Sequence, residues 1–173
     1  RQYGKLRMFV HAEGTQTNDG EVTAFIRLGT DLTNNYYEYE IPLKMTRQGQ
    51  ASPEDVWPAD NEFIIELEEL INTKIQRTNA NHPFTSPYYR QSGRIKYTVI
   101  GLPDLSNVRV AMLGVRNPRA VPGSIDDGLP KCTEVWFNEL RMTEFNNRGG
   151  WAANARIQAK LAGTHLRLLA YQP

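Results

Sequence analysis

The chain has 173 residues, a length that suits one domain with its own core, and its 20 basic and 19 acidic side chains give a net charge of +1. Residues 1–80 carry eight basic and thirteen acidic side chains, whereas residues 81–173 carry twelve basic and six acidic ones. This asymmetry between the two halves of the sequence gives no reason to expect a nucleic-acid partner. Cys132 is the only cysteine, which excludes an internal disulfide, and no apolar run approaches the roughly 20 residues of a membrane-spanning helix.

Three strands are predicted in the first part of the chain, because apolar and polar residues alternate there. They lie at Lys5–Ala12, Glu21–Leu28 and Tyr36–Leu43. Asp19-Gly20, between the first two, is a dipeptide that closes hairpins and predicts that these strands pair. Pro42 lacks a backbone donor, so it indicates an edge strand or a bulge near the end of the third strand.

The hydrophobic period changes in the next segment. Glu62–Leu67 is predicted as a strand, and a helix is expected from Leu67 to about Arg77. The helical stripe consists of Leu67, Leu70, Ile71, Lys74 and Ile75. A single helix over Asn61–Thr78 is the alternative, because Phe63 and Ile64 extend the stripe backwards. The segment Thr78–Gly93 contains two prolines and is predicted to be a long surface loop.

The second half of the chain again has the pattern of strands. They are expected at Arg94–Ile100, Asn107–Arg116 and Glu134–Phe145, with a long loop over Asn117–Lys131. Together with the earlier elements, this gives about eight strands and one short helix. The chain is therefore predicted to be mostly β, an antiparallel β-sandwich of jelly-roll type with one short helix.

The last predicted strand, Trp151–Leu161, has a small or apolar residue at every second position. The Asn- and Gly-containing loop before it predicts a hairpin with Glu134–Phe145. A helix is the alternative, since Ala, Arg, Gln, Lys and Leu are good helix formers. We expect residues 1–150 to form the sandwich module and residues 151–173 to form a C-terminal strand and tail that leads out of it.

The sequence contains no recognisable catalytic constellation. His11, His82 and His165 are isolated from one another, and none has a second ligand at metal-binding spacing. No Gly-rich loop followed by Lys predicts a nucleotide site. We therefore expect a protein that is not an enzyme and that uses no cofactor.

Two weaker signals concern binding. Calcium needs six to eight oxygen ligands, and the candidate residues supply only two for each site, so no metal is expected. These weak calcium candidates are Asp126, Asp127, Asn138 and Glu139. A second group, in the predicted loop, consists of Phe84, Tyr88, Tyr89 and Arg90. Aromatic side chains in a loop are typical of ligand or partner contacts, and the alternative is that they cover an edge of the core.

Six blocks in one order carry a resemblance to a known family. The blocks are Tyr36–Leu43; Val56-Trp57-Pro58 with Asn61-Glu62; Leu67-Glu68 with Leu70; Leu113–Pro118; Glu134-Val135-Trp136 with Asn138–Arg141; and Gly149–Ala153. In these blocks the chain resembles a segment of the SprA/Sov family, the giant outer-membrane translocon proteins of type 9 secretion, which some bacteria also need for gliding motility. The last ten residues depart from the family's pattern.

The resemblance implies a structural module of an outer-membrane protein-secretion translocon, at the outer membrane or cell surface. Its partners would be other subunits of the translocon, the exported cargo protein and the rest of a parent β-barrel. Because the sequence begins with Arg1, we expect it to be part of such a longer chain. A carbohydrate-binding jelly-roll module of a cell-surface protein is the alternative, based on the sandwich fold and the loop with Tyr88 and Tyr89.

Overall fold

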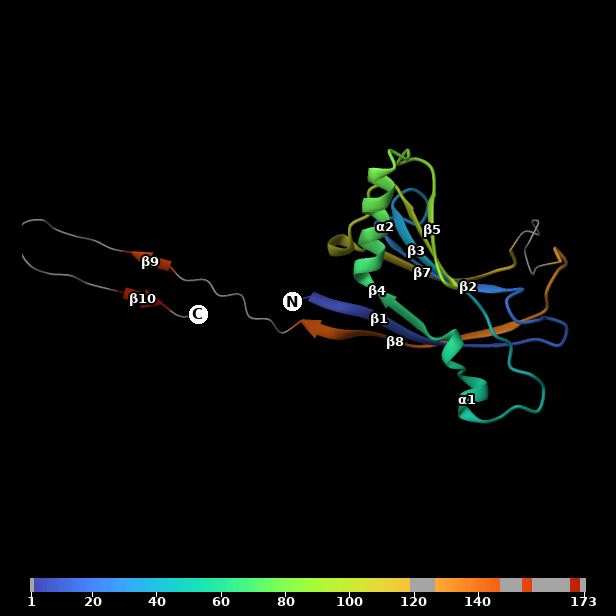
Figure 1. Cartoon of the computed structure of the whole chain (residues 1–173). Helices are drawn as coiled ribbons and strands as arrows, with labels where there is room; N and C mark the ends of the chain where they lie inside the picture. Colours follow the sequence, from blue (N-terminus) through green and yellow to red (C-terminus); the bar gives the residue numbers. More distant parts are fainter. Residues whose placement is uncertain (1, 119–126, 147–153, 157–168, 172–173) are drawn as a thin grey trace, which may run out of the picture.

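The computed structural model describes residues 2–118, 127–146, 154–156 and 169–171, and two antiparallel sheets dominate it (Figure 1). The first sheet has the order β4 (Phe63–Glu66), β1 (Gln2–Glu13), β8 (Glu134–Asn146). The second has the order β5 (Tyr88–Ser92), β6 (Ile95–Ile100), β3 (Tyr36–Pro42), β2 (Thr23–Gly29), β7 (Val110–Arg116). These sheets confirm the expected mostly β, antiparallel sandwich.

The core lies between the two sheets and follows from the alternation of each strand. Leu6, Met8, Val10 and Ala12 of β1 all point inward and are at most 6% exposed. Phe63 of β4 is fully buried, and its ring lies 5.2 Å from that of Tyr39 in the opposite sheet and 6.3 Å from that of Phe137. Burial of apolar side chains from both sheets is the main force that holds the sandwich together.

Strand β8 contains a bulge that explains its mixed sequence pattern. Arg7 pairs with Arg141 and Phe9 with Asn138, so Met8 alone faces two residues of β8. Glu139, one of these two, has a φ of +56°. Because the bulge adds one residue, odd-numbered residues before it and odd-numbered residues after it point to opposite faces of the sheet. Charged and apolar residues that alternate in step along the sequence therefore do not share a face. The strand lies within the sandwich as expected, at the end of its sheet.

Helix α2 (Leu67–Asn79) follows β4 directly, which confirms the predicted strand-to-helix change at Leu67. The alternative of one continuous helix is wrong, because Phe63–Glu66 pairs with β1. The buried residues of α2 are Leu70, Thr73 and Arg77. Ile71 and Ile75, which the stripe predicted to face the core, are 44% and 51% exposed. No helix among the described residues combines the length and apolar character needed to cross a bilayer.

Short elements connect the strands. Helix α1 (Pro53–Val56) and the 3-10 turn η1 (Ala59–Asn61) precede β4, and a second 3-10 turn, η2 (Leu105–Asn107), precedes β7. The side-chain amide of Asn61 donates to the Lys44 carbonyl at 2.8 Å and its oxygen accepts from the Lys44 N–H at 2.7 Å. This pair of bonds anchors the connection after β3.

Two predictions about the first strands are wrong. Strands β1 and β2 do not form a hairpin across Asp19-Gly20, because they belong to different sheets. The Gly20 N–H donates instead to the Leu43 carbonyl, and Asp19 accepts from the Met45 N–H. Strand β3 is central rather than an edge. Pro42 is tolerated because β6 pairs with β3 only as far as Glu40, so no neighbour requires the missing N–H.

The predicted loop over Thr78–Gly93 is also wrong in part. Helix α2 extends to Asn79, and Tyr88–Ser92 forms strand β5, which pairs with β6. Gly93 has a φ of +58°, and this left-handed conformation makes the tight turn between the two strands. The tyrosine pair that suggested a binding loop therefore lies on a strand.

The predicted C-terminal hairpin lies mostly outside the described residues. The part described, β9 (Asn154–Arg156), is a strand, but its partner is β10 (Leu169–Tyr171). Strand β8, the expected partner, pairs with β1. The strand character was therefore predicted for these three residues, and their pairing was not.

Candidate functional site

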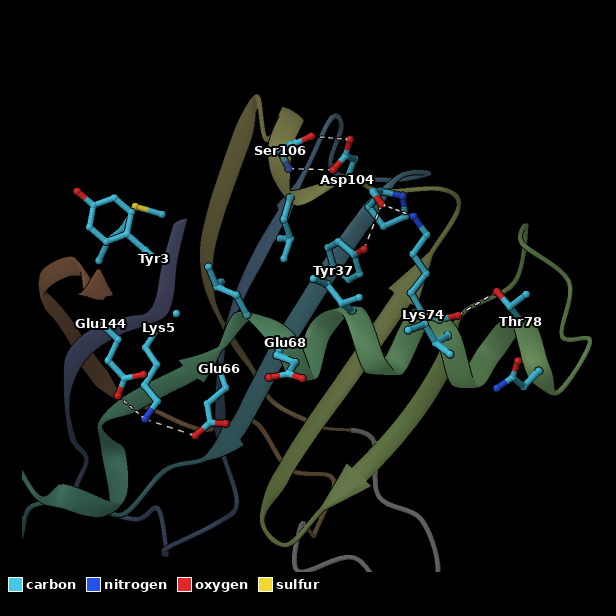
Figure 2. A pocket seen from close by; sticks show the side chains of 18 residues that line it. Tyr3, Lys5, Tyr37, Glu66, Glu68, Lys74, Thr78, Asp104, Ser106 and Glu144 are labelled. Carbon is cyan, nitrogen blue, oxygen red and sulfur yellow. Dashed lines mark hydrogen bonds and ion pairs between the residues drawn. The ribbon is translucent and has the colours of Figure 1, made fainter. Parts of the chain in front are cut away.

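A groove of about 1320 Å³ runs beside helix α2 (Figure 2). We call it the α2 groove. Helix α2 forms one side, the segment around η2 lies opposite, and the ends of β1 and β8 close one end. Its lining residues are Tyr3, Gly4, Lys5, Tyr37, Glu66, Leu67, Glu68, Ile71, Lys74, Ile75, Thr78, Asn79, Pro103, Asp104, Leu105, Ser106, Met142 and Glu144.

The apolar part of the lining of the α2 groove, which we call its floor, is exposed. Ile71 and Ile75 of the helix contribute to it, as do Tyr3 of β1 and Met142 of β8, and these four side chains are between 43% and 54% exposed. Large apolar side chains gathered in one concave surface are typical of a binding site for another molecule. The stripe of α2 thus serves two surfaces, with Leu70 in the core and the two isoleucines in the groove.

The charged part of the lining of the α2 groove, which we call its rim, is acidic. It carries four carboxylates and two ammonium groups, a formal charge of −2. Lys5 lies between two of the carboxylates, at 2.7 Å from Glu144 and 3.6 Å from Glu66. The hydrogen bond to Glu144 is the main cause that raises the pKa of Lys5. Lys74 donates to the Pro103 carbonyl at 2.7 Å, so both lysines are already engaged by the protein.

Asp104 stands across the groove from the helix and is held in place by its own turn. Its carboxylate accepts from the Ser106 hydroxyl at 2.7 Å and from the Ser106 N–H at 2.9 Å. These two bonds lower the pKa of Asp104, with a smaller contribution from Lys74. Asp104 is therefore a fixed negative charge at neutral pH.

The aromatic group suggested as a ligand contact does not form one surface. Tyr88 is partly buried against the core, 5.5 Å from the His82 ring, and Tyr89 on the opposite face of β5 is 60% exposed. Arg90 pairs with Glu69 at 2.6 Å and covers the ring of Tyr97 at 4.4 Å. Phe84 covers the guanidinium of Arg77 at 4.7 Å. Tyr89 lies 5.9 Å from the Lys96 ammonium group, so all four predicted contact residues make interactions within the fold.

The weak calcium candidates are also dispersed. Asp126 lies outside the described residues, and Asp127 is bound to Lys131 at 2.8 Å. Asn138 and Glu139 lie on β8 at the bulge, where Glu139 is 3.6 Å from Arg141. Within the residues that the structure describes, no group of three or more His, Cys, Asp or Glu is placed to hold a metal ion.

The histidines are separate from one another where they are described. His11 is 4% exposed and lies beside the rings of Trp57 and Trp136, with its Nδ1 atom 2.7 Å from the Val56 carbonyl. These contacts attach the α1 segment to the outer face of the three-stranded sheet. Trp57 and Trp136 belong to two of the sequence blocks described above, so those blocks meet in space.

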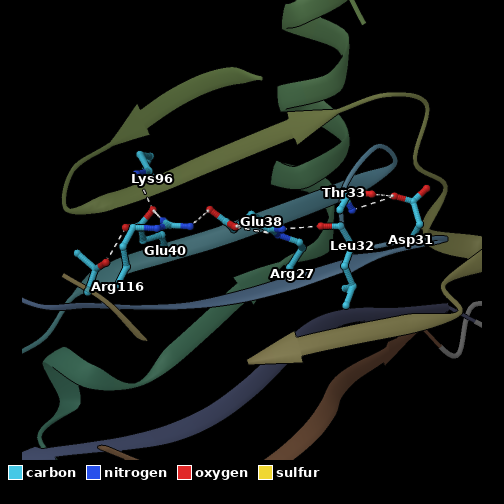
Figure 3. A network of polar contacts seen from close by, with 9 residues as sticks. Arg27, Asp31, Leu32, Thr33, Glu38, Glu40, Lys96 and Arg116 are labelled. Carbon is cyan, nitrogen blue, oxygen red and sulfur yellow. Dashed lines mark hydrogen bonds and ion pairs between the residues drawn. The ribbon is translucent and has the colours of Figure 1, made fainter. Parts of the chain in front are cut away.

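A buried charge network covers the outer face of the five-stranded sheet (Figure 3). Glu38 and Glu40 are each 3% exposed. Arg27 donates to Glu38 at 2.6 Å, Lys96 is 2.5 Å from Glu40, and Arg116 bridges both carboxylates. Burial raises the pKa of Glu40, but the bonds from Lys96, Thr23 and Arg116 together outweigh it, so that pKa lies below its usual value. The network therefore keeps Glu40 ionised and joins β2, β3, β6 and β7.

The lowered carboxyl pKa values predict a stability that falls in acid. Backbone N–H bonds from Asn34 and Thr33 and the amide of Asn35 hold the pKa of Asp31 well below its usual value, and Arg90 lowers that of Glu69. A carboxyl whose folded-state pKa is depressed stabilises the fold above its unfolded value of about 4, and this contribution is lost as pH falls through the folded value. We expect the urea midpoint to be constant between about pH 6 and 8 and to fall below about pH 5.

The same titration has an internal control. Asp31→Asn should flatten the fall of the urea midpoint between about pH 5 and 3, because one depressed carboxyl no longer titrates. Glu54→Gln changes an exposed carboxyl of α1 and should retain the pH dependence of the wild type. Urea midpoints that rise toward acid would contradict the prediction.

The α2 groove was missed by sequence reasoning. Its helical residues were recognised as a stripe, but a stripe does not say whether the core or solvent receives each member. No signal in the sequence places Tyr3 and Met142 beside Ile71, because these residues are far apart in the chain.

Comparison with known proteins identifies the family of the chain. No curated protein matches the chain. The model of the SprA_N family, described as motility related/secretion protein, matches residues 1–165. The match covers both sheets, helix α2 and all the residues of the α2 groove. The chain therefore belongs to the SprA_N family of motility-related and secretion proteins.

Proposed function

We propose that this chain is a non-catalytic structural module of a protein-secretion translocon in the outer membrane, the translocon of type 9 secretion and gliding motility. Membership of a motility and secretion family supports this role. The module would present docking surfaces to other translocon subunits and would line the route of exported cargo. It would occupy the outer membrane or cell surface as part of a larger β-structured chain.

The main support for the proposal is that the first and last strands of the sandwich lie next to each other. Its entry strand β1 and its exit strand β8 run side by side over their whole length, and Gln2 is the cross-strand partner of Asn146. Figure 1 shows both ends on the same side of the sandwich. A module attached through one antiparallel ribbon fits onto a larger β-structure without disturbing its strand order. The carbohydrate-binding alternative has less support, because β5 separates Tyr88 and Tyr89 onto opposite faces.

Excision of the module tests the proposed role. Since Gln2 and Asn146 are cross-strand partners, a two-residue Asn-Gly turn can join them in the parent protein in place of residues 3–145. We expect the parent still to fractionate with the outer membrane while secretion of exported proteins and gliding are lost. Wild-type secretion and gliding in the excised strain would overturn the proposal.

A second measurement tests the proposed location in the intact parent protein. Cys132 is exposed, so a maleimide reagent can label it in outer-membrane fractions, with Cys132→Ser as the control for specificity. Labelling of Cys132 in the outer-membrane fraction is the expected result. Labelling confined to another cell fraction would contradict the proposed location.

A further inference from the structure

We propose that the α2 groove binds a cationic, amphipathic segment of another subunit of the secretion machinery, an inference that rests on the proposed function. The apolar part of the argument is the floor. Ile71, Ile75, Tyr3 and Met142 remain about half exposed although they come from three separate elements of the fold. Alternate apolar side chains of an extended or helical segment would cover them and remove this surface from water.

The negative charge of the rim determines which kind of segment the groove can bind. The rim carries four carboxylates, and the only two ammonium groups of the lining are engaged, Lys5 by Glu144 and Glu66, and Lys74 by the Pro103 carbonyl. Among the described residues no cation pairs with Glu68, which is exposed on the first turn of α2. A segment with Lys or Arg between its apolar residues would place positive charge against Glu68 and Asp104. An acidic segment or a nucleic acid would be repelled.

The dimensions of the groove favour a permanent partner subunit over the exported cargo proteins. Lys5 of β1 links Glu66 of β4 to Glu144 of β8 at the closed end of the groove. The side along α2, from Leu67 to Thr78, spans roughly 17 Å at 1.5 Å per residue. About five residues of an extended chain cover that length. A short segment of constant sequence fits such a site, whereas cargo proteins differ in sequence.

Binding of short peptides to the full chain tests the inference. Three fluorescently labelled eight-residue probes separate the contributions: alternating Leu and Lys, alternating Leu and Glu, and alternating Ser and Lys. We expect the Leu-Lys peptide to bind at least ten-fold more tightly than either of the others. Its affinity should fall between 50 mM and 500 mM NaCl, because exposed charges are screened. Equal affinity for the Leu-Lys and Leu-Glu probes would overturn the proposal.

Variants locate the site. The double change Ile71→Ser and Ile75→Ser removes the exposed helical floor and should weaken Leu-Lys binding at least ten-fold. Glu68→Lys should weaken Leu-Lys binding and strengthen binding of the Leu-Glu probe. Leu102→Ser is the matched control, since Leu102 is 60% exposed and lies outside the groove. Circular dichroism checks that each variant keeps the fold, and unchanged binding by a folded double variant would overturn the proposal.

Evidence that the same chain or a second copy of it fills the groove would also overturn the proposal. A photo-crosslinker at Ile75 that reacts with residues 147–173 of the same chain, which carry four basic and no acidic side chains, would show that the groove is filled internally. Dimerisation of the purified chain that the double variant abolishes would show a second copy in the groove. The expected result is a monomer that binds the Leu-Lys peptide in trans.

An experiment in cells separates this inference from the proposed function. The double variant in the parent protein should reduce secretion while the parent stays in the outer membrane. If module excision abolishes secretion and the double variant does not change it, the groove inference fails and the proposed function stands. If excision has no effect, the proposed function fails whatever the peptides show.

Discussion

Replacing Phe63 with alanine is expected to lower the free energy of unfolding by about 3–5 kcal/mol, the largest effect of any single change considered for this protein. Phe63 is fully buried between the sheets, and its ring touches Tyr39 of one sheet and Phe137 of the other. Its removal would forfeit both ring contacts and would leave a cavity at the point where the sheets meet. Urea denaturation followed by tryptophan fluorescence measures the change.

Two further variants show whether position or residue type matters at this site. Phe63→Leu should cost about 1–2 kcal/mol, because most of the volume and the apolar character are kept. Phe145 is 42% exposed, so Phe145→Ala should cost about 1 kcal/mol or less. A loss below about 1 kcal/mol for Phe63→Ala would show that the sheets do not depend on this contact.

The second large effect is expected at Glu40. Removing its carboxylate by Glu40→Ala would leave Arg116 and Lys96 without the partner that they share on the outer face of the sheet. Breaking a fully buried ion pair costs about 3–5 kcal/mol, and these two cations are about one-third exposed, so the expected loss is about 2–4 kcal/mol. Thermal and urea denaturation at pH 7 both measure it.

Glutamine at the same position separates charge from shape. Glu40→Gln keeps an acceptor for the Thr23 hydroxyl and loses the negative charge, so its stability should lie between those of the wild type and Glu40→Ala. Glu54→Ala, at an exposed position of α1, should change the unfolding free energy by no more than about 0.5 kcal/mol. Equal stability of Glu40→Ala and the wild type would show that the network contributes nothing.

The local elements could largely be predicted, because each depends on the pattern of a short segment. Period-two alternation marked β1, β2 and β3, and the change of period at Leu67 marked the start of α2. Strand β5 was missed because the prolines before it and Gly93 after it are typical of loops. Glycine at this point instead supplies the left-handed turn of a hairpin.

The bulge on β8 shows a different limit. Its sequence has charged and apolar residues of the same parity, which gave no clean inner face. Pairing with β1 resolves this pattern, since two residues of β8 lie opposite Met8. A bulge is defined by two strands together, so the sequence of one strand cannot place it.

The sequence by itself determined the class of the protein: a mostly β chain with one short helix, no internal disulfide, and residue blocks that resemble a secretion family. The strands and the helix follow from short-range periodicity, the absence of an internal disulfide follows from composition, and the family follows from the resemblance of the six residue blocks. Tertiary structure alone decided that β1 pairs with β4 and β8 rather than with β2, that Glu38 and Glu40 are buried among three cations, and that Ile71 and Ile75 face a groove. Each of these depends on contacts between residues distant in the chain, where many pairings satisfy the same alternation and only the packing of the whole core selects one.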